Sequence, residues 1–318
     1  MKKLILCLAF LLNLNLINAQ KPIGPKICGS KISTDNYTAL NTKIDNYLWT
    51  ENVTTSLINN KLVKIPIIFH IIYDTITQSN AVTKTLLDKQ VSVLNSAYRL
   101  KNIKEVNTKA PKEFAALAGD MKIEFYIDSI IRKKTTEKEF FEYDDGVKFD
   151  STGGSNVIKP LTKLNIWICN LEEGLLGYAR FPGDGDNVDG VALGYVNYGI
   201  LAKGDTTTWW KSYSEGEVAV HEIGHWLGLY HIWGDDCFFN IASSGSCMGS
   251  DQVDDTPNQR CATRGCPNGK VIIQGCGCAA MYMNYMDYTN NQCMYMFTKG
   301  QVRRARAALK TMRSGFIK

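Results

Sequence analysis

Histidine and long apolar runs are both scarce in this chain of 318 residues, which has only four histidines. Beyond residue 19, no apolar stretch approaches the roughly 20 residues that a membrane-spanning helix needs. Lys and Arg form no dense run, and no nucleic-acid-binding motif is present. The sequence shows no internal repeats and no boundary of a second domain. These absences argue against membrane, nucleic-acid-binding and repeat proteins, and they favour one large soluble domain.

Residues 1–19 have the pattern of a secretory signal peptide. Two lysines precede an apolar core over residues 4–16, and small Ala19 follows that core. The core is too short for a membrane anchor, and Asn13 and Asn15 interrupt it. We therefore expect an exported protein.

Three of the four histidines lie in one stretch, HEIGHWLGLYH. On a helix, His221 and His225 point to the same face, so both imidazoles can bind one metal ion. Glu222 lies beside them, where it can hold a metal-bound water. Gly228 permits a left-handed turn that brings His231 back as a third ligand. Three protein ligands and an open fourth position are typical of catalytic zinc.

Cysteines are numerous, as expected of an exported protein: the chain has ten. Cys7 belongs to the signal peptide, and seven of the other nine lie between Cys237 and Cys293. This crowding predicts disulfides; a second zinc site is the alternative, although the usual two-residue gaps are missing. Because nine is odd, at least one cysteine has another role. We interpret Cys169, inside an apolar run, as a buried small hydrophobic residue.

Cys28 stands alone in the segment KICGS, ahead of the first long apolar run. One interpretation is a stray or paired cysteine. The other is a latency ligand, whose thiolate fills the open position on zinc until the segment is removed, because thiolate is a good zinc ligand. Residues 20–60, called the leader below, show no sustained periodicity, so we expect them to be loosely ordered.

Apolar periodicity predicts both strands and helices. The expected strands cover residues 62–73, 121–131, 161–171 and 191–198, and the expected helices cover 83–100, 214–227 and 298–312. The strand over 191–198 is the candidate edge on which an extended peptide adds. His70, in the first strand, is interpreted as structural. The last helix is expected to carry its basic residues outward.

A short acidic stretch, DQVDDTP, gathers Asp251, Asp254, Asp255 and Thr256. One interpretation is a solvated acidic turn. The other is a calcium site, because calcium prefers oxygen ligands and the surrounding segment looks irregular.

The chain resembles the metzincin metalloproteases, and among them the pappalysin family in its compact bacterial form. The extended histidine motif is followed by NYMDY, which matches the downstream Met-turn. The match rests on HEIGHWLGLYHIWG, DQVDDTP, RGCP, NYMDYTNNQCMYMFTKGQVRRARAAL and the early ICGS. The resemblance covers most of residues 62–318 and reaches back to the leader.

The resemblance implies an α+β fold of the metzincin type. Its upper lobe would hold a twisted, mixed, five-stranded sheet with helices, and its lower lobe would be irregular and tied by disulfides. The three histidines would bind one catalytic zinc, with Glu222 as general base and acid. Met286 would form a hydrophobic floor under the metal, and Tyr288 would assist the oxyanion. Calcium at the acidic stretch and latency through Cys28 are also family features.

We therefore expect a secreted, monomeric zinc endopeptidase that acts on polypeptides. It would have a signal peptide over 1–19, a propeptide over 20–60 and a catalytic domain over 61–318. The alternative is a secreted zinc- and calcium-binding module without peptidase activity, against which Glu222 argues. Family members can prefer a basic residue after the cut. Here Asn290, Asn291 and Gln292 follow the Met-turn without a carboxylate, which argues against that preference.

Overall fold

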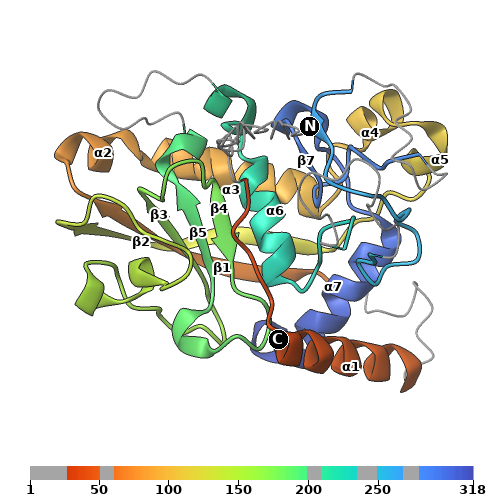
Figure 1. Ribbon diagram of the computed structural model, residues 1–318, viewed down its shortest axis with the longest axis horizontal. Helices are drawn as coiled ribbons and strands as arrows, with labels where there is room; N and C mark the ends of the chain where they lie inside the picture. Colours follow the sequence, from red (N-terminus) through yellow and green to blue (C-terminus); the bar gives the residue numbers. More distant parts are fainter. Residues whose placement is uncertain (1–26, 51–60, 199–208, 235–248, 268–278, 318) are drawn as a thin grey trace, which may run out of the picture.

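A twisted five-stranded sheet in the order β2-β1-β3-β5-β4 forms the centre of the protein (Figure 1). The computed structural model describes residues 27–50, 61–198, 209–234, 249–267 and 279–317. The strands are β1 (Val63–Tyr73), β2 (Ile123–Lys134), β3 (Leu164–Cys169), β4 (Gly177–Ala179) and β5 (Val191–Gly194). Neighbouring strands are parallel except β4, which is antiparallel to β5 and lies at the edge of the sheet.

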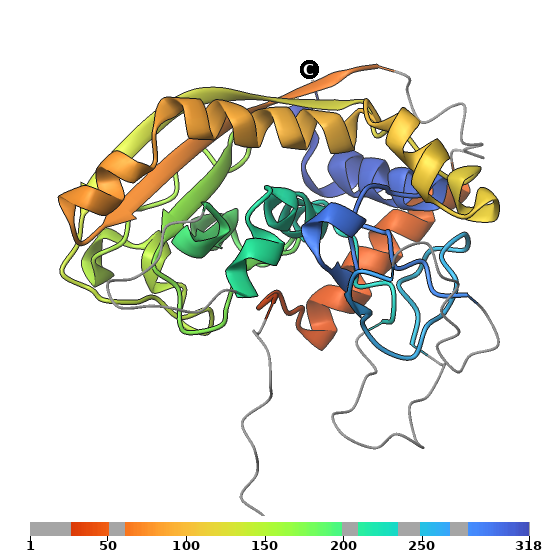
Figure 2. The same cartoon turned by 90° about the horizontal axis from the view of Figure 1, so that it is seen from above.

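Helices α2 (Ile76–Ala81), α3 (Lys84–Tyr98) and α6 (Glu217–Trp226) accompany this sheet. Helix α3 packs on β2 and on α6, and α6 packs on β4 and β5 (Figure 2). The Tyr98 hydroxyl donates to the Val220 carbonyl at 2.9 Å and so joins α3 to α6. Because α6 is buried between sheet and loops, almost every side chain on it is apolar or belongs to the metal motif.

The remaining elements are α1 (Thr34–Thr50), α4 (Ile103–Lys109), α5 (Lys112–Ala115), α7 (Lys299–Met312) and the short strands β6 (Arg264–Gly265) and β7 (Tyr288–Thr289). The predicted strands at β1, β2 and β3 and the predicted helices at α3, α6 and α7 are confirmed. Periodicity located them because each buries one stripe or both faces in the core.

The prediction of an edge strand over 191–198 is wrong. β5 ends at Gly194 and continues as a 3₁₀ helix over Tyr195–Tyr198. It pairs with β3 on one side and β4 on the other. The edge is β4, a strand of only three residues, which is too short to give a period-two signal.

The leader is more ordered than the sequence suggested. Helix α1 occupies Thr34–Thr50 and packs against α7 (Figure 1). Only Leu40 and Ile44 of this helix are buried. Two apolar anchors in 17 residues are too few to show as a repeating pattern, which explains why periodicity missed it.

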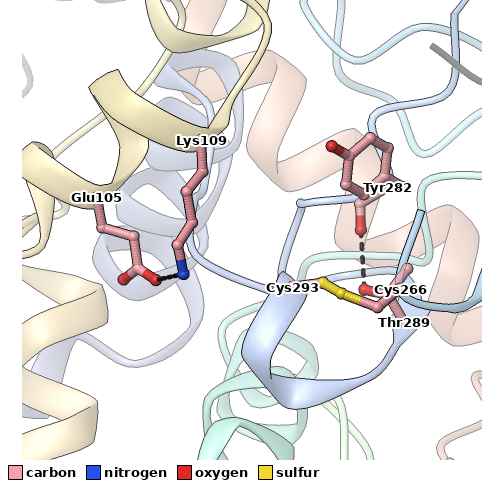
Figure 3. Close-up of a disulfide and its surroundings, with 6 residues drawn as sticks. All are labelled: Glu105, Lys109, Cys266, Tyr282, Thr289 and Cys293. Carbon is pink, nitrogen blue, oxygen red and sulfur yellow. Dashed lines mark hydrogen bonds and ion pairs between the residues drawn. A yellow bond between two sulfur atoms is a disulfide. The ribbon is translucent and has the colours of Figure 1, made fainter. Parts of the chain in front are cut away.

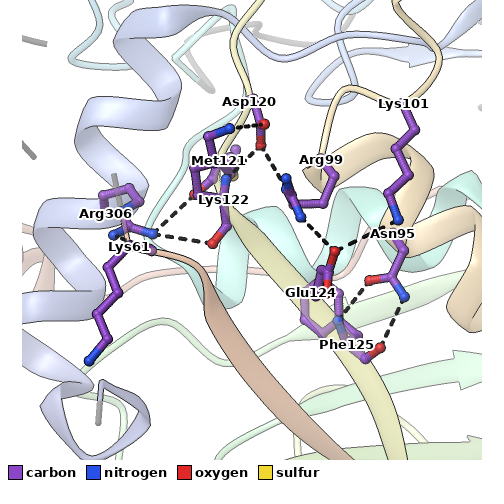
Figure 4. Close-up of polar contacts among 10 residues, drawn as sticks. All are labelled: Lys61, Asn95, Arg99, Lys101, Asp120, Met121, Lys122, Glu124, Phe125 and Arg306. Carbon is purple, nitrogen blue, oxygen red and sulfur yellow. Dashed lines mark hydrogen bonds and ion pairs between the residues drawn. The ribbon is translucent and has the colours of Figure 1, made fainter. Parts of the chain in front are cut away.

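The basic residues of α7 do not all face solvent, contrary to expectation. Arg304 and Arg306 are 3% and 6% exposed. Arg306 donates to the carbonyl oxygens of Met121 and Lys61, at the starts of β2 and β1 (Figure 4). A guanidinium has five N–H donors, so one buried arginine can hold two chain segments together.

Between α6 and α7, the described residues hold few regular elements. Cys266 and Cys293 form a disulfide there, next to the Thr289 hydroxyl that donates to the Tyr282 carbonyl (Figure 3). This pair supports disulfides over a second zinc site. Cys169 is fully buried in β3 with a free thiol, as predicted.

Candidate metal centre

Two histidines project from α6 toward one point. His221 and His225 are 3% and 1% exposed, and their Nε2 atoms lie 3.1 Å apart. Nδ1 of His221 lies 2.7 Å from the Tyr285 carbonyl oxygen, and Nδ1 of His225 lies 2.8 Å from that of Leu229. A carbonyl oxygen only accepts, so each Nδ1 carries the proton and donates it. Each Nε2 therefore presents a lone pair to the shared point.

His231 reaches the same point through a turn at Gly228. Gly228 has φ +84°, and a Cβ on it would lie 3.1 Å from the Ala308 Cβ, so both conformation and space favour glycine. Nε2 of His231 lies 3.3 Å from that of His221 and 3.1 Å from that of His225. The turn thus adds a third imidazole nitrogen to the pair on α6.

The three histidines fit a zinc ion. Neighbouring nitrogens in a tetrahedral zinc site are roughly 3.3 Å apart, given Zn–N bonds of about 2.0–2.1 Å. The observed Nε2 separations of 3.1–3.3 Å match this spacing. The lone pairs of His221 and His225 cannot hydrogen-bond to each other, so a cation between them stabilises the arrangement. Burial, together with the neighbouring histidines, lowers the pKa of His225 well below its usual value and favours the neutral, metal-binding form.

Glu222 is fully buried beside these ligands on the same helix. Its Oε2 accepts from the Ser30 hydroxyl at 2.8 Å and lies 3.5 Å from the Cys28 sulfur. Within the described part of the chain, its Oε1 has no hydrogen-bond partner. Burial raises the pKa of Glu222 to about 8. A carboxyl group with such a pKa can take up and release a proton near neutral pH.

The leader lies along β4 and places a thiol at the histidines. The Gly29 N–H donates to the Gly177 carbonyl at 2.9 Å, and Cys28 forms a parallel bridge with the same residue. The Ala179 N–H donates to the Ser30 hydroxyl at 2.7 Å. The Cys28 sulfur and the ligand atoms of the three histidines all lie within 4.8 Å of one another. The Cys28 sulfur is thus close enough to the histidine nitrogens to share one metal ion with them.

Met286 packs closely against helix α6. It is fully buried, and a Cβ on Gly224 would lie 2.4 Å from its sulfur. Glycine between Glu222 and His225 therefore lets the Met-turn approach α6 closely. The sequence pattern gave Gly224 no role, because its importance depends on a residue 62 positions later.

Tyr288 lies next to the histidines, in β7. Its ring centroid is 5.6 Å from that of His221 and 5.0 Å from that of His231. Trp233 stacks on His231 with centroids 4.3 Å apart, and it also meets the Tyr288 ring edge to face at 4.7 Å. These aromatic contacts restrict the positions of His231 and Tyr288.

A narrow pocket adjoins His221, and Ile27 of the leader is one of its lining residues. Its lining includes His221, Glu222, Tyr288 and Asn291, and Ile27 from the leader also borders it. Other lining residues are Tyr213, Val218, Asp287, Thr289 and Met294. Ile27 is 6% exposed, and only about 10 Å³ remains open. We call this the apolar pocket, because the wall area exposed inside it comes from apolar atoms.

Two carboxylates border the apolar pocket, Glu222 and Asp287, and protein donors already engage Asp287. Its Oδ1 accepts from the backbone N–H groups of Thr263 and Tyr288, and its Oδ2 accepts from the Gln259 side chain. It is fully buried. Burial raises the pKa of Asp287 to about 6. This carboxylate holds the loops around the Met-turn together.

The predicted calcium residues do not meet at one point. Asp255 accepts from the Thr298 hydroxyl at 2.6 Å and the Gly300 N–H at 2.8 Å, at the start of α7. Asp251 accepts from the Thr256 hydroxyl at 2.8 Å, while Asp254 is exposed. Among the described residues, the only cluster of His, Cys, Asp or Glu close enough to hold a metal is Cys28 with the three histidines.

Sequence reasoning missed Ser30 and Glu142. Ser30 connects Glu222 to the β4 backbone, and Glu142 pairs with Lys31 of the leader at 2.7 Å. Neither belongs to a spacing motif, so only the three-dimensional arrangement reveals them. His70 lies outside the centre, where its two ring nitrogens contact Ser155 and Asn165, each at 2.9 Å.

Comparisons with known proteins agree with this geometry. Residues 155–310 match the M43 peptidase family, described as pregnancy-associated plasma protein-A. An extracellular metalloprotease of Arthroderma otae is 38% identical over 157 residues, which are 48% of this chain and 53% of the relative. The chain thus spans about half the length of that relative. Another from Arthroderma gypseum is 30% identical over 263 residues, 80% of this chain and 75% of the relative.

Two solved structures share the fold. Mature mirolysin of Tannerella forsythia in complex with a cleaved peptide has 37% identity and a TM-score of 0.71, covering 81% of this chain and 96% of that one. Promirolysin from the same organism, in a mutant form, has 34% identity and a TM-score of 0.73. The match covers 92% of this chain and 97% of promirolysin. With the α+β fold and the histidine centre, these matches show that the chain belongs to the pappalysin family of metzincin metalloproteases.

Proposed function

We propose that the protein is a secreted zinc endopeptidase. The observation that carries this proposal is the convergence of three histidine nitrogens beside a buried glutamate, next to the edge strand β4. The matched relatives are named extracellular metalloproteases, and mature mirolysin was solved with a cleaved peptide. No described helix is both long and apolar enough to cross a bilayer. A signal peptide over 1–19, outside the described residues, would account for secretion.

His221, His225 and His231 would hold the zinc, which when bound supplies Lewis acidity and lowers the pKa of water. Glu222 would take a proton from the attacking water and deliver it to the leaving amine. Tyr288 would donate a hydrogen bond to the oxygen that becomes negative, from its place beside His221 and His231.

Strand β4 would bind the substrate backbone. The leader already pairs with Gly177 on this edge. A peptide that replaces the leader could use the same backbone groups, which is a general way to bind an extended chain. The peptide would then lie close to α6, which carries His221 and His225, because α6 packs against β4.

We further propose that the protein is made as a latent precursor and that Cys28 is its latency ligand. The position of Cys28 among the histidines supports this, as does the hydrogen bond from Ser30 to Glu222. The leader would then occupy the metal and the general base together. Promirolysin, a precursor form by its name, matches more of this chain than mature mirolysin does.

The catalytic domain would begin at residue 61, after a propeptide over 20–60. Arg306 binds the Lys61 carbonyl at 3.2 Å, so residues from Lys61 onward are held to α7 after the cut. Lys64 lies within β1, paired with Glu124, and a cut there would divide the strand. Lys61 is therefore the better candidate for the processing site.

Calcium binding at the acidic stretch 251–256 remains a prediction. Asp251 and Thr256 are both buried, and each has side-chain oxygen atoms that could bind a cation. Burial raises the pKa of Asp251 to about 7, and a bound cation would offset that cost. Asp255 instead serves α7, as its two hydrogen bonds indicate.

The apolar pocket would select an apolar substrate side chain. Ile27 of the leader is buried at its wall, and Asn291, also in the wall, is uncharged. Asp287 is engaged by Thr263, Tyr288 and Gln259. Asp287 would thus not be available to a guanidinium or ammonium, and Glu222, the other carboxylate of the pocket, would serve the attacking water, in line with the weak case for a Lys/Arg preference at this position.

The test is cleavage of a peptide library by the activated full chain, with and without a zinc chelator. We expect internal cuts that the chelator abolishes and that zinc restores, with Ile, Leu or Met favoured on one side of the cut. If the activated, zinc-loaded protein cuts no peptide, the binding-module alternative is the correct one, and the histidine centre is then structural.

A further inference from the structure

Glu142 lies beside the leader on the far side of Cys28 from the apolar pocket. Its Oε1 is 2.7 Å from Nζ of Lys31, and the two side chains are 8% and 73% exposed, respectively. The Glu142 carboxylate is therefore largely buried, whereas the Lys31 side chain lies at the surface. A change of partner would cost Glu142 little reorganisation.

The chain around Glu142 is fixed by the protein itself. Phe140 and Leu171 form a parallel bridge, and the Phe140 N–H donates to the Asn170 carbonyl at 2.9 Å. Nη2 of Arg180 donates to the Glu142 carbonyl at 2.9 Å. None of these contacts involves the leader, so they would persist after the leader is removed.

Glu142 also lies close to the path of any peptide along β4. A Cβ on Gly29 would come within 2.7 Å of Oε2 of Glu142. Gly29 is the residue whose N–H pairs with Gly177 of β4. A substrate backbone on this strand would therefore pass within reach of the carboxylate.

The guanidinium of Arg180, whose Nη2 donates to the Glu142 carbonyl, is held by another carboxylate. Arg180 points its charged group at Asp145, with Nε 2.8 Å and Nη2 2.7 Å from Oδ2. Lys148 is also paired with Asp145, at 2.9 Å. Arg180 and Lys148 are thus both held by Asp145, and Lys31 of the leader contacts the Glu142 side chain.

We propose that Glu142 forms a subsite for a lysine or arginine side chain of the substrate. This cation would lie on the opposite side of the scissile bond from the residue in the apolar pocket, because the leader places Ile27 and Lys31 on opposite sides of Cys28. The inference rests on the proposed peptidase function. In the latent chain Lys31 fills the subsite. When the leader is released, the subsite becomes accessible to a substrate side chain.

The expected preference is moderate. An ion pair with one partner at the surface contributes less than a fully buried pair. We expect kcat/KM to be about threefold to tenfold higher for a peptide with Lys than for its Ala counterpart. Because the pair is partly exposed, the ratio should shrink as salt concentration rises.

The test uses the activated full chain and peptides that share one apolar residue for the pocket. Lys, Ala or Glu is placed in turn at each of the three positions on either side of the bond. Glu142→Gln should bring the Lys-to-Ala ratio close to one, and Glu142→Lys should favour the Glu peptide. Ratios within one enzyme cancel any general change in activity or folding.

The matched control is Glu139→Gln, which removes the same charge from an exposed residue three positions away. It should keep the ratio of the unaltered protein. The subsite is refuted if the unaltered protein cuts Lys and Ala peptides equally, if Lys helps only on the same side as the apolar residue, or if its preference survives Glu142→Gln. If no peptide is cut at all, the peptidase function fails and the subsite fails with it.

Discussion

The carbonyl groups of Tyr285 and Leu229 set the chemistry of His221 and His225. Each accepts the Nδ1 proton and so directs an Nε2 lone pair to the metal position. The spacing of the histidines predicts that they meet, but the tautomers depend on two backbone atoms outside the helix. A side chain can be placed by pattern, whereas its protonation depends on contacts that only the fold provides.

Gly224 is a residue-scale test of the Met-turn. Gly224→Ala would place a Cβ 2.4 Å from the Met286 sulfur. Alanine is the better helix former by about 1 kcal/mol, yet we expect weaker zinc binding because Met286 and α6 must move apart. Zinc affinity measured by competition with a chelator checks this. Gly224→Ala combined with Met286→Ala should recover part of the loss; no loss in the single variant would contradict the account.

His70 predicts a pH dependence of stability that is independent of the metal. Burial lowers the pKa of His70 from 6.5 to about 4. Between these pH values the unfolded chain binds a proton that the folded chain does not, so stability falls as pH falls. The full effect is on the order of 3 kcal/mol. Urea unfolding from pH 7 to 4 measures it, and His70→Gln should reduce the slope over this range.

At the scale of elements, the leader is held by more than its cysteine. Helix α1 packs on α7, and Arg304 of α7 donates to Asn41 at 2.7 Å. Tyr37 stacks on Tyr230 with centroids 5.0 Å apart. Three separate contacts therefore keep Cys28 near the histidines, and latency should not depend on one bond alone.

Cys28→Ala should make the full-length precursor partly active before the leader is removed. The variant loses the thiol at the metal but retains α1 and the Ser30 contact with Glu222, so we expect less activity than in the processed protein. Peptide cleavage by uncleaved precursor measures this. Cys169→Ala, which removes another buried free thiol, should leave the precursor inactive. An inactive Cys28→Ala precursor that becomes active on processing would contradict the latency role.

Asp255 tests whether the acidic stretch serves a helix or a metal. Because it accepts from Thr298 and Gly300 at the start of α7, Asp255→Ala should lower the free energy of unfolding by about 1–2 kcal/mol. We expect the same loss with calcium or with a calcium chelator present. Thermal unfolding under both conditions decides this; a loss seen only with calcium would assign Asp255 to the ion.

Sequence reasoning located long elements and failed on short ones. β1 and α3 were predicted because each repeats its apolar pattern over many residues. β4 has three residues and α1 buries only Leu40 and Ile44, so neither gives a repeating signal. The substrate edge was consequently assigned to β5, which in fact lies inside the sheet.

For the whole molecule, the metal centre joins parts that are distant in sequence. The leader, β4, α6 and the Met-turn contribute residues from Cys28 to Tyr288. The histidine motif could be identified from the sequence because its ligands lie within one short stretch. The placement of Cys28, Ser30 and Glu142 could not be derived from spacing, because it depends on how the leader crosses the sheet edge.

Turnover by Glu222→Gln is the measurement that tests the central claim most directly. The activated variant should bind one zinc per chain, because its three histidines are unchanged. Its kcat on a peptide that the unaltered protein cuts should fall by at least about 10³-fold, because the proton acceptor is gone. Equal zinc content with near-total loss of cleavage is the predicted result. Retained cleavage would contradict the role of Glu222 and the proposed mechanism.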